Sequence, residues 1–279
     1  MLSKITAAAL LPTAVMLSIS AQAFSYETMD TAAQLSKGNV RAAVYYINKT
    51  YMPVLQVEGQ STISVNVDDG SGGTATVEYL SYNRQTIECS SQSGDTVIRV
   101  AANPFEGLTW WAKLGSSNYT LDIPSVTVTN SVSGTRPGLI AGLGVRNQLF
   151  PDTIVTPGIC VDFGLTLYSY EFDRFTTNAA GAGVNPVNNR FEVAETKLTF
   201  LVSKSDFRGS GIEPYGGISV FRYYTRIIDK DTRVHADGYT DNLDVFLGAR
   251  IKLYPLEWLI AECNLAGSAN LSLGFGWGH

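Results

Sequence analysis

The chain has little charge and little histidine. Charged residues make up 16% of its 279 residues, histidine occurs twice, and the formal net charge is -5. A protein that binds nucleic acid would carry a basic patch or stripe, and no such patch occurs, so we expect no nucleic-acid partner. The charged fraction is also low for an ordinary soluble secreted domain.

Long apolar runs are missing after the first two dozen residues. Residues 1–23 combine Lys4, an apolar stretch from Ile5 to Ile19 and the small-residue box Ala21-Gln22-Ala23, which predicts a secretory signal peptide. An N-terminal membrane anchor is the alternative, but the stretch is shorter than the roughly 20 residues that span a bilayer. A membrane protein of this sequence would therefore cross as strands closed into a barrel.

What the chain does have is apolar residues at every second position. In the last segment Leu271, Leu273, Phe275 and Trp277 alternate with Ser272 and with three glycines. Successive side chains of a strand point to opposite faces, so one face is apolar and the other is polar or nearly bare. This alternation predicts a transmembrane barrel; a soluble all-β domain is the alternative.

The pattern predicts strands along most of the chain. Beyond the opening segment, these are 94–103, 108–114, 138–148, 159–167, 191–203, 212–228, 241–254, 258–265 and 270–278. Links rich in Pro, Gly or Asn, typical of turns, fall at 103–107, around Pro151, at 207–211 and at 255–257. Longer polar links fall at 116–136, 174–190 and 229–240. Short turns on the periplasmic side and long loops outside are the outer-membrane arrangement.

The fold class that follows is all-β: a single-chain antiparallel up-and-down transmembrane barrel of about 10 strands, with 8 to 12 as the range. We place the signal peptide at residues 1–23, an N-terminal lead-in at 24–37 and the barrel at 38–279. In this version Gly38–Asn48 is the first strand, and Tyr51–Ser93 is an outer loop with its own hairpin around residues 68–73. Taking Thr76–Glu88 as the first strand instead preserves the even strand count.

These features resemble the small Gram-negative outer-membrane β-barrel proteins of the OmpA and OmpX type, over nearly all of the mature chain. The resemblance rests on the leader, the alternating strands, the rhythm of short turns and long loops, and the aromatic-rich last strand. It implies an outer-membrane location, contact with outer-membrane lipid, and insertion by the outer-membrane assembly machinery, which reads a terminal aromatic residue. Here His279 is terminal and Trp277 stands two residues before it.

Charged residues gather on the faces opposite the apolar rows, which predicts that they line the lumen. The candidates are Arg99, Lys113, Arg146, Asp162, Glu195, Lys197, Glu213, Asp244, Arg250 and Lys252. They could border a narrow, charge-tuned passage for small solutes. They could equally form a plug of ion pairs, because side chains largely fill so narrow a barrel.

The three cysteines, Cys89, Cys160 and Cys263, would meet an oxidising compartment, and an odd number leaves at least one without an intramolecular partner. The strand directions place Cys89 and Cys263 toward the outer side and Cys160 near the periplasmic end. A Cys89–Cys263 disulfide is therefore one hypothesis, and three isolated small apolar side chains are the other.

Catalytic and metal-binding patterns are scarce. A nucleophilic site needs a base held rigidly within hydrogen-bond reach, but His235 falls in a predicted loop and His279 at the terminus. No histidine, cysteine or carboxylate spacing typical of metal ligands occurs. We predict no catalytic residue, no metal site, no cofactor and no enzymatic activity.

The function predicted from sequence is a porin-like passage for small solutes or a structural wall component of the outer membrane. A surface adhesin or receptor that uses the outer loops is the alternative. A lipid-modifying outer-membrane enzyme is less favoured, because the chain has only two histidines and neither is placed as a catalytic base.

Overall fold

The computed structural model describes residues 31–32, 35, 37–68, 74–124, 129–177, 183–205, 209–265 and 271–278. The predicted signal peptide, residues 1–23, lies outside these ranges. None of the described segments is a helix that is long and apolar enough to cross a membrane.

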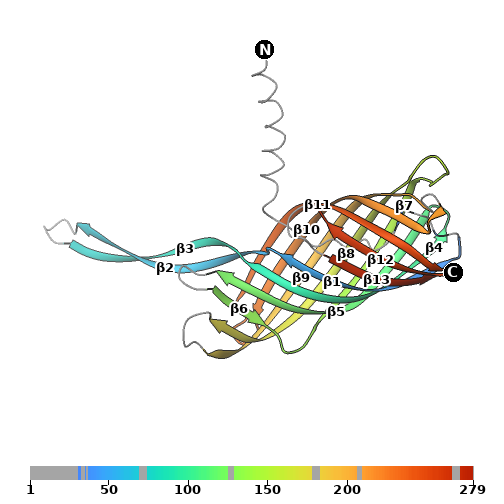
Figure 1. The fold of residues 1–279 in the computed structure, drawn as a ribbon. Helices are drawn as coiled ribbons and strands as arrows, with labels where there is room; N and C mark the ends of the chain where they lie inside the picture. The colour runs from blue at the N-terminus through green and yellow to red at the C-terminus, as the bar shows by residue number, and fades with distance from the viewer. Residues whose placement is uncertain are drawn as a thin grey trace, which may run out of the picture.

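The described residues form antiparallel strands (Figure 1). Their bounds are β1 Val40–Tyr51, β2 Val54–Asp68, β3 Thr74–Glu88, β4 Ser90–Phe105, β5 Leu108–Pro124, β6 Thr129–Ser133, β7 Gly138–Phe150, β8 Gly158–Thr177, β9 Val184–Ser203, β10 Ile212–Asp229, β11 His235–Tyr254, β12 Glu257–Asn264 and β13 Leu271–Gly278.

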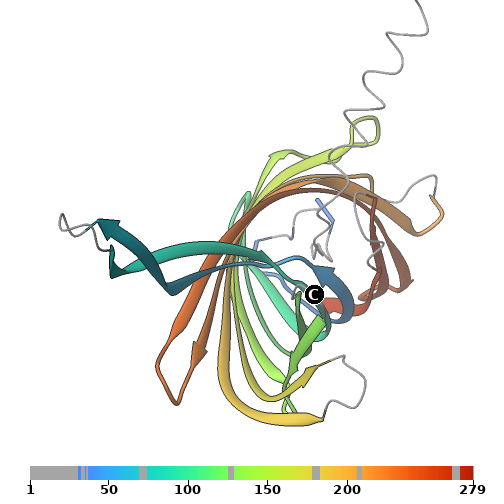
Figure 2. The ribbon, with the colours of Figure 1, turned by 90° about the vertical axis from the view of Figure 1, so that its left-hand side faces the viewer.

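Ten of the described strands close into a ring. The order is β1, β4, β5, β7, β8, β9, β10, β11, β12 and β13, and β13 pairs back with β1, Arg41 opposite Gly278. The ring is an antiparallel barrel, seen nearly along its axis in Figure 2. The predicted fold class and strand number are confirmed, and Gly38–Asn48 corresponds to the first wall strand. The choice of Thr76–Glu88 as that strand is wrong, because this segment is β3 and lies outside the ring.

The remaining strands, β2, β3 and β6, lie at one end of the barrel. We call this end, with the parts of the wall strands that reach into it, the outer extension. β6 pairs with β5 and β8 beyond the end of β7, and the β2–β3 hairpin projects away from the ring (Figures 1 and 2). β8 and β9 contain 20 residues each, whereas about 9–11 residues span a bilayer. About half of each strand therefore lies beyond the membrane.

The sequence predicts three long polar links, but the structure extends strands through most of each: 116–136, 174–190 and 229–240. In the first link the alternation continues with large inward side chains, since Tyr119 and Leu121 of β5 are buried. In the other two links the strands continue as paired hairpins beyond the membrane, with Thr176 opposite Val184 and Ile228 opposite His235. Cross-strand pairing and interior packing, rather than the membrane, make these segments strands.

The outer wall is apolar and the inner wall is polar in the membrane-spanning half. Leu114, Leu139 and Leu143 point outward and are exposed, as is the row from Leu271 to Trp277 in β13. The alternation assigned to both faces from sequence is confirmed in β5, β8, β11 and β13.

Glycines on the inner wall make room for two tryptophans. A Cβ added at Gly276 would lie 2.3 Å from Nε1 of Trp258, and one at Gly164 would lie 2.6 Å from Cζ2 of Trp111. No side chain fits at these distances, so the bare row of the last strand faces a filled interior.

Candidate functional site

The lumen is the candidate site, and a buried carboxylate organises its periplasmic part. Asp162 of β8 accepts hydrogen bonds from Nε and Nη2 of Arg146 on β7, at 2.9 and 2.6 Å. Nη2 of Arg99 on β4 lies 3.3 Å from the same oxygen, and Nε1 of Trp111 donates to the other at 2.8 Å. The Arg99 guanidinium also stacks over Trp111, 4.6 Å from the ring centre. All four side chains are buried, so we call them the Asp162 cluster.

Part of the N-terminal segment lies inside the ring against this cluster (Figure 2). Nη1 of Arg146 donates to the carbonyl oxygen of Thr31 at 2.8 Å, and the amide of Ala32 donates to Oγ of Ser203 at 2.9 Å. Leu35 is buried and packs with the cluster's tryptophan. The sequence treats residues 24–37 as a lead-in to the wall; these contacts place its described part in the lumen.

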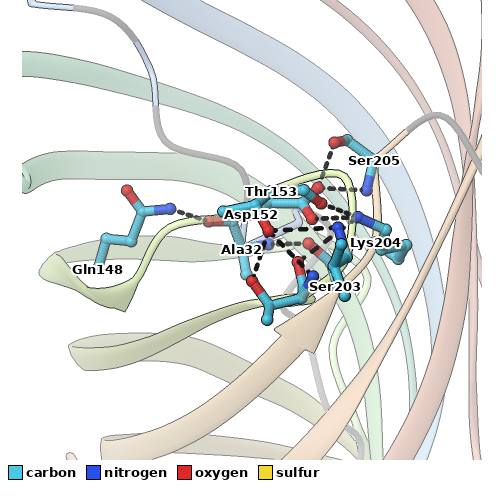
Figure 3. A network of polar contacts seen from close by, with 9 residues as sticks. Ala32, Gln148, Asp152, Thr153, Ser203, Lys204 and Ser205 are labelled. Carbon is cyan, nitrogen blue, oxygen red and sulfur yellow. Dashed lines mark hydrogen bonds and ion pairs between the residues drawn. The ribbon is translucent and has the colours of Figure 1, made fainter.

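The same end is tied together by the turn after β7. Asp152 accepts a hydrogen bond from Nζ of Lys204 at 2.8 Å and from the amide of Ser205 at 2.6 Å (Figure 3). Lys204 also donates to the carbonyl of Thr153. Burial raises the pKa of the Asp152 carboxyl, but the hydrogen bonds from Lys204 and Ser205 outweigh this and hold its pKa below the ordinary value.

A second ion pair lies farther around the ring. Nη2 of Arg250 on β11 hydrogen-bonds Oε2 of Glu213 on β10, and its guanidinium stacks 5.2 Å from the ring centre of Trp258. Arg41 stacks on the same tryptophan at 5.2 Å. Two cations thus contact one tryptophan ring, and the negative face of an aromatic ring attracts such cations.

A third group lies farther toward the outer extension. Nζ of Lys49 is 2.6 Å from Asp95 and donates to the hydroxyl of Tyr168 at 3.2 Å. That hydroxyl donates in turn to Oε2 of Glu195 at 3.2 Å. The four side chains come from β1, β4, β8 and β9 and are buried, so this chain of contacts links several parts of the wall.

Stacked rings fill the lumen beyond this group. The ring centroids of Tyr119 and Tyr170 are 4.3 Å apart, those of Tyr119 and Phe191 are 5.4 Å apart, and those of Phe172 and Phe191 are 5.7 Å apart. All four are buried. We call them the aromatic layer.

The structure places nine of the ten predicted lumen residues as buried or partly buried inward side chains: Arg99, Lys113, Arg146, Asp162, Glu195, Lys197, Glu213, Asp244 and Arg250. Lys252 continues the inward row of β11 but is exposed where the strand ends. The lysine therefore does not belong to the packed interior.

Sequence reasoning missed several interior charges. Asp95 and Glu262 are buried and stand on the same faces of their strands as Arg99 and Trp258, so extending the alternation would have found both. Glu262 accepts a hydrogen bond from the hydroxyl of Tyr215 at 3.0 Å. Lys49 lies one residue beyond the predicted first strand, which ends at Asn48.

The hypothesised Cys89–Cys263 disulfide is absent, since all three cysteines are free thiols. Cys89 is buried and Cys263 is exposed, and in β12 Cys263 lies on the outward face, opposite to its buried neighbours Glu262 and Asn264. A side chain on the lipid-facing side of the wall cannot reach one inside it.

The described residues contain no group of three metal-ligating side chains. His235 is exposed, and its Nε2 lies 3.9 Å from Oδ2 of Asp237, an aspartate that also accepts two hydrogen bonds from Arg226. His279 lies outside the described residues.

Comparison with family models and with curated proteins finds no match. Among solved structures, the chain is similar to the translocator domain of the autotransporter NalP from Neisseria meningitidis, at 13% identity and a TM-score of 0.42, covering 99% of this chain and 96% of that one. It is also similar to the outer membrane protease OmpT from Escherichia coli, at 9% identity and a TM-score of 0.46, covering 89% and 98%. The P. putida toluene transporter TodX matches at 9% identity and a TM-score of 0.31, covering 88% and 90%.

Because these scores are low, the protein's class rests on its own surface. A closed ring of strands leaves no unpaired wall edge, and an apolar belt surrounds a polar, charged interior, as the bilayer requires. The chain is an outer-membrane β-barrel.

Proposed function

We propose that this protein is a structural component of the outer membrane: a barrel closed by its own side chains that holds the outer extension at the cell surface. The observation that carries this proposal is the filling of the lumen at successive levels. Thr31, Ala32 and the Asp162 cluster occupy the periplasmic part, the Lys49 group follows, and the aromatic layer fills the outer part.

A porin-like passage has less support from this geometry. A hydrated solute would have to separate buried ion pairs, and leaving one partner of such a pair uncompensated costs about 3–5 kcal/mol. It would also have to displace Thr31 and Ala32, whose backbone groups are hydrogen-bonded to the wall. In wide pores, by contrast, the charged side chains of the lumen border a water-filled channel.

Planar-bilayer recording tests the proposal. The purified full chain, shown to be folded by a change in gel migration on boiling, should give no steady conductance steps. Steps of constant size in the same preparation would contradict a closed barrel and favour the solute passage. A known open porin recorded in the same membrane is the positive control.

A surface-binding role is the second candidate, and the β2–β3 hairpin favours it. Each of its strands has 15 residues, and its pairing with the ring is a single bridge between Gln56 and Asp237. An isolated two-stranded hairpin is marginally stable in water, so a partner would stabilise it. Cells that display the full chain should then adhere to matrix-coated surfaces better than cells whose protein lacks residues 57–85; equal adhesion would contradict this role.

We further propose that the barrel is not an enzyme. His235, the one described histidine, is exposed and lies beside an aspartate that Arg226 already engages. A general base must be held within hydrogen-bond reach of a nucleophile, and the structure shows no such hydrogen bond to His235 among the described residues.

A further inference from the structure

The outward face of β8, β9 and β10 has a hollow just beyond the apolar belt. Leu167, Ala194 and Tyr224 lie side by side in one row across these strands, Leu167 opposite Ala194 and Ala194 opposite Tyr224. The small alanine between two larger side chains leaves a hollow of about 290 Å³. We call it the Ala194 notch.

The notch lies on the boundary between apolar and polar wall. On the membrane side, the adjacent row contains Leu165, Thr196 and Arg222 in register, and the row after it is wholly apolar, with Phe163, Leu198 and Val220 exposed on the outward face. On the other side the next row contains Ser169, Glu192 and Arg226, in register with one another. The apolar wall therefore reaches the notch along β8, through Leu165 and Leu167, and an acyl chain in the notch meets the membrane on that side.

Two arginines border the polar side of the notch, Arg190 and Arg226. Nε and Nη2 of Arg226 donate to the two carboxylate oxygens of Asp237 at 2.7 and 3.2 Å, and its Nη2 also lies 3.2 Å from the hydroxyl of Tyr224. Nε of Arg190 lies 2.9 Å from Oε1 of Glu192. Each carboxylate holds one edge of its guanidinium, which leaves donors of a planar fork for a further acceptor.

Both arginines are accessible from outside the barrel: the Arg190 side chain is 48% exposed and that of Arg226 is 40% exposed. Hydrogen bonds from Arg226 to Asp237 hold the pKa of that carboxyl below its ordinary value, and the same contacts raise the pKa of Arg226. The guanidinium group is charged at every physiological pH.

We propose that the Ala194 notch binds a lipid of the outer leaflet that carries a phosphate headgroup. The phosphate oxygens accept hydrogen bonds from the guanidinium groups of Arg190 and Arg226, whose forked donors match phosphate geometry. The first carbons of an acyl chain lie over Ala194, between Leu167 and Tyr224. Selective binding requires both the arginines and the apolar row. The arginines alone would also bind free phosphate, and the apolar row alone would bind any lipid.

Native mass spectrometry of the full chain in detergent tests the proposal, with a bisphosphorylated lipid A as the probe. We expect one bound lipid per barrel at low probe concentration. Arg190→Gln combined with Arg226→Gln should weaken this binding about tenfold or more, because two charge-assisted contacts are lost. Ala194→Leu should weaken it by filling the notch.

Arg222→Gln is the matched control. Arg222 lies on the same face of β10, is paired with Asp241 in the same way, and does not border the notch. Its substitution removes one charge and leaves one carboxylate unpaired, as Arg226→Gln by itself does, and it should leave the affinity unchanged because Arg222 does not border the notch. Heat-modifiable gel migration shows that every variant is folded.

Two further probes identify the source of the phosphate. The dephosphorylated lipid should bind the wild-type chain weakly, and inorganic pyrophosphate without acyl chains should not compete. Competition by pyrophosphate would overturn the lipid assignment. Equal binding by wild type, the double variant and Arg222→Gln would overturn the notch itself.

Discussion

Two arginine–aspartate pairs in this barrel have the same placement on neighbouring strands and opposite surroundings. Arg146–Asp162 and Arg222–Asp241 each join register partners on adjacent strands, each with a shortest nitrogen–oxygen distance of 2.6 Å. The first pair faces the lumen with side chains 5% and 6% exposed; the second faces outward with side chains 64% and 55% exposed. The contrast shows that the side of the wall, rather than the contact, decides what an ion pair does.

The buried pair lies in a packed interior, so water cannot solvate its charged groups when the ion pair is broken. Asp162 is the shared counter-charge of two arginines and accepts a hydrogen bond from a tryptophan, so removing its charge takes that counter-charge from both guanidinium groups. The outward pair loses little when it breaks, because water replaces the partner. Charge inside this barrel is therefore structural, and charge beyond the belt is available for binding.

The largest effect should come from Asp162→Asn. We expect the free energy of unfolding to fall by about 3–5 kcal/mol, since Arg99 and Arg146 lose their shared counter-charge inside the wall. Urea unfolding in lipid vesicles, followed by gel migration without boiling, measures the change. Asp241→Asn is the control and should leave the midpoint nearly unchanged; equal losses in the two variants would refute the contrast.

A smaller loss of stability should follow from a substitution that fills the space occupied by Trp111 in the lumen. Gly164→Leu places a side chain where Trp111 lies, and overpacking of this kind costs about 1–3 kcal/mol. Ala112→Leu, on the outward face of β5, enlarges a side chain against lipid and should cost nothing measurable in the same assay. An unchanged free energy of unfolding in Gly164→Leu would show that the interior is loosely packed.

The smallest effect should be the pH dependence of the turn after β7. The pKa of Asp152 is below its ordinary value in the folded chain, so its contribution to stability is complete above about pH 4, near the pKa of a free aspartate. This contribution is lost as the pH falls through the folded-state pKa. Wild type should be more stable than Asp152→Asn at pH 6, and the difference should shrink toward pH 3; a constant difference would contradict the assignment.

Sequence predicted the ring well because the signal for it is local. An alternation of period two appears in each strand by itself, so β5, β8, β11 and β13 could be assigned faces without knowing their neighbours. Turn residues then fixed the short connections. Charges such as Asp162 and Arg146 followed from the same alternation, although nothing local shows that they meet.

The outer extension and the lumen filling were harder to predict because they depend on long-range contacts. Residues around Tyr119 are predicted as a polar link, and their strand structure depends on rings, among them Phe191, that stack across the lumen. The burial of Thr31 depends on Arg146, more than a hundred residues away. No sequence pattern within residues 24–37 predicts such a contact.

The four tryptophans allow the most direct test of the account, since Trp110 and Trp111 are neighbours on opposite faces of β5. Trp110 is 53% exposed on the outer wall, and Trp111 is 6% exposed in the Asp162 cluster. In single-tryptophan variants, with the other three replaced by phenylalanine, lipids brominated on their acyl chains should quench Trp110 strongly and Trp111 weakly. Equal quenching, or stronger quenching of Trp111, would contradict a barrel whose apolar rows contact lipid.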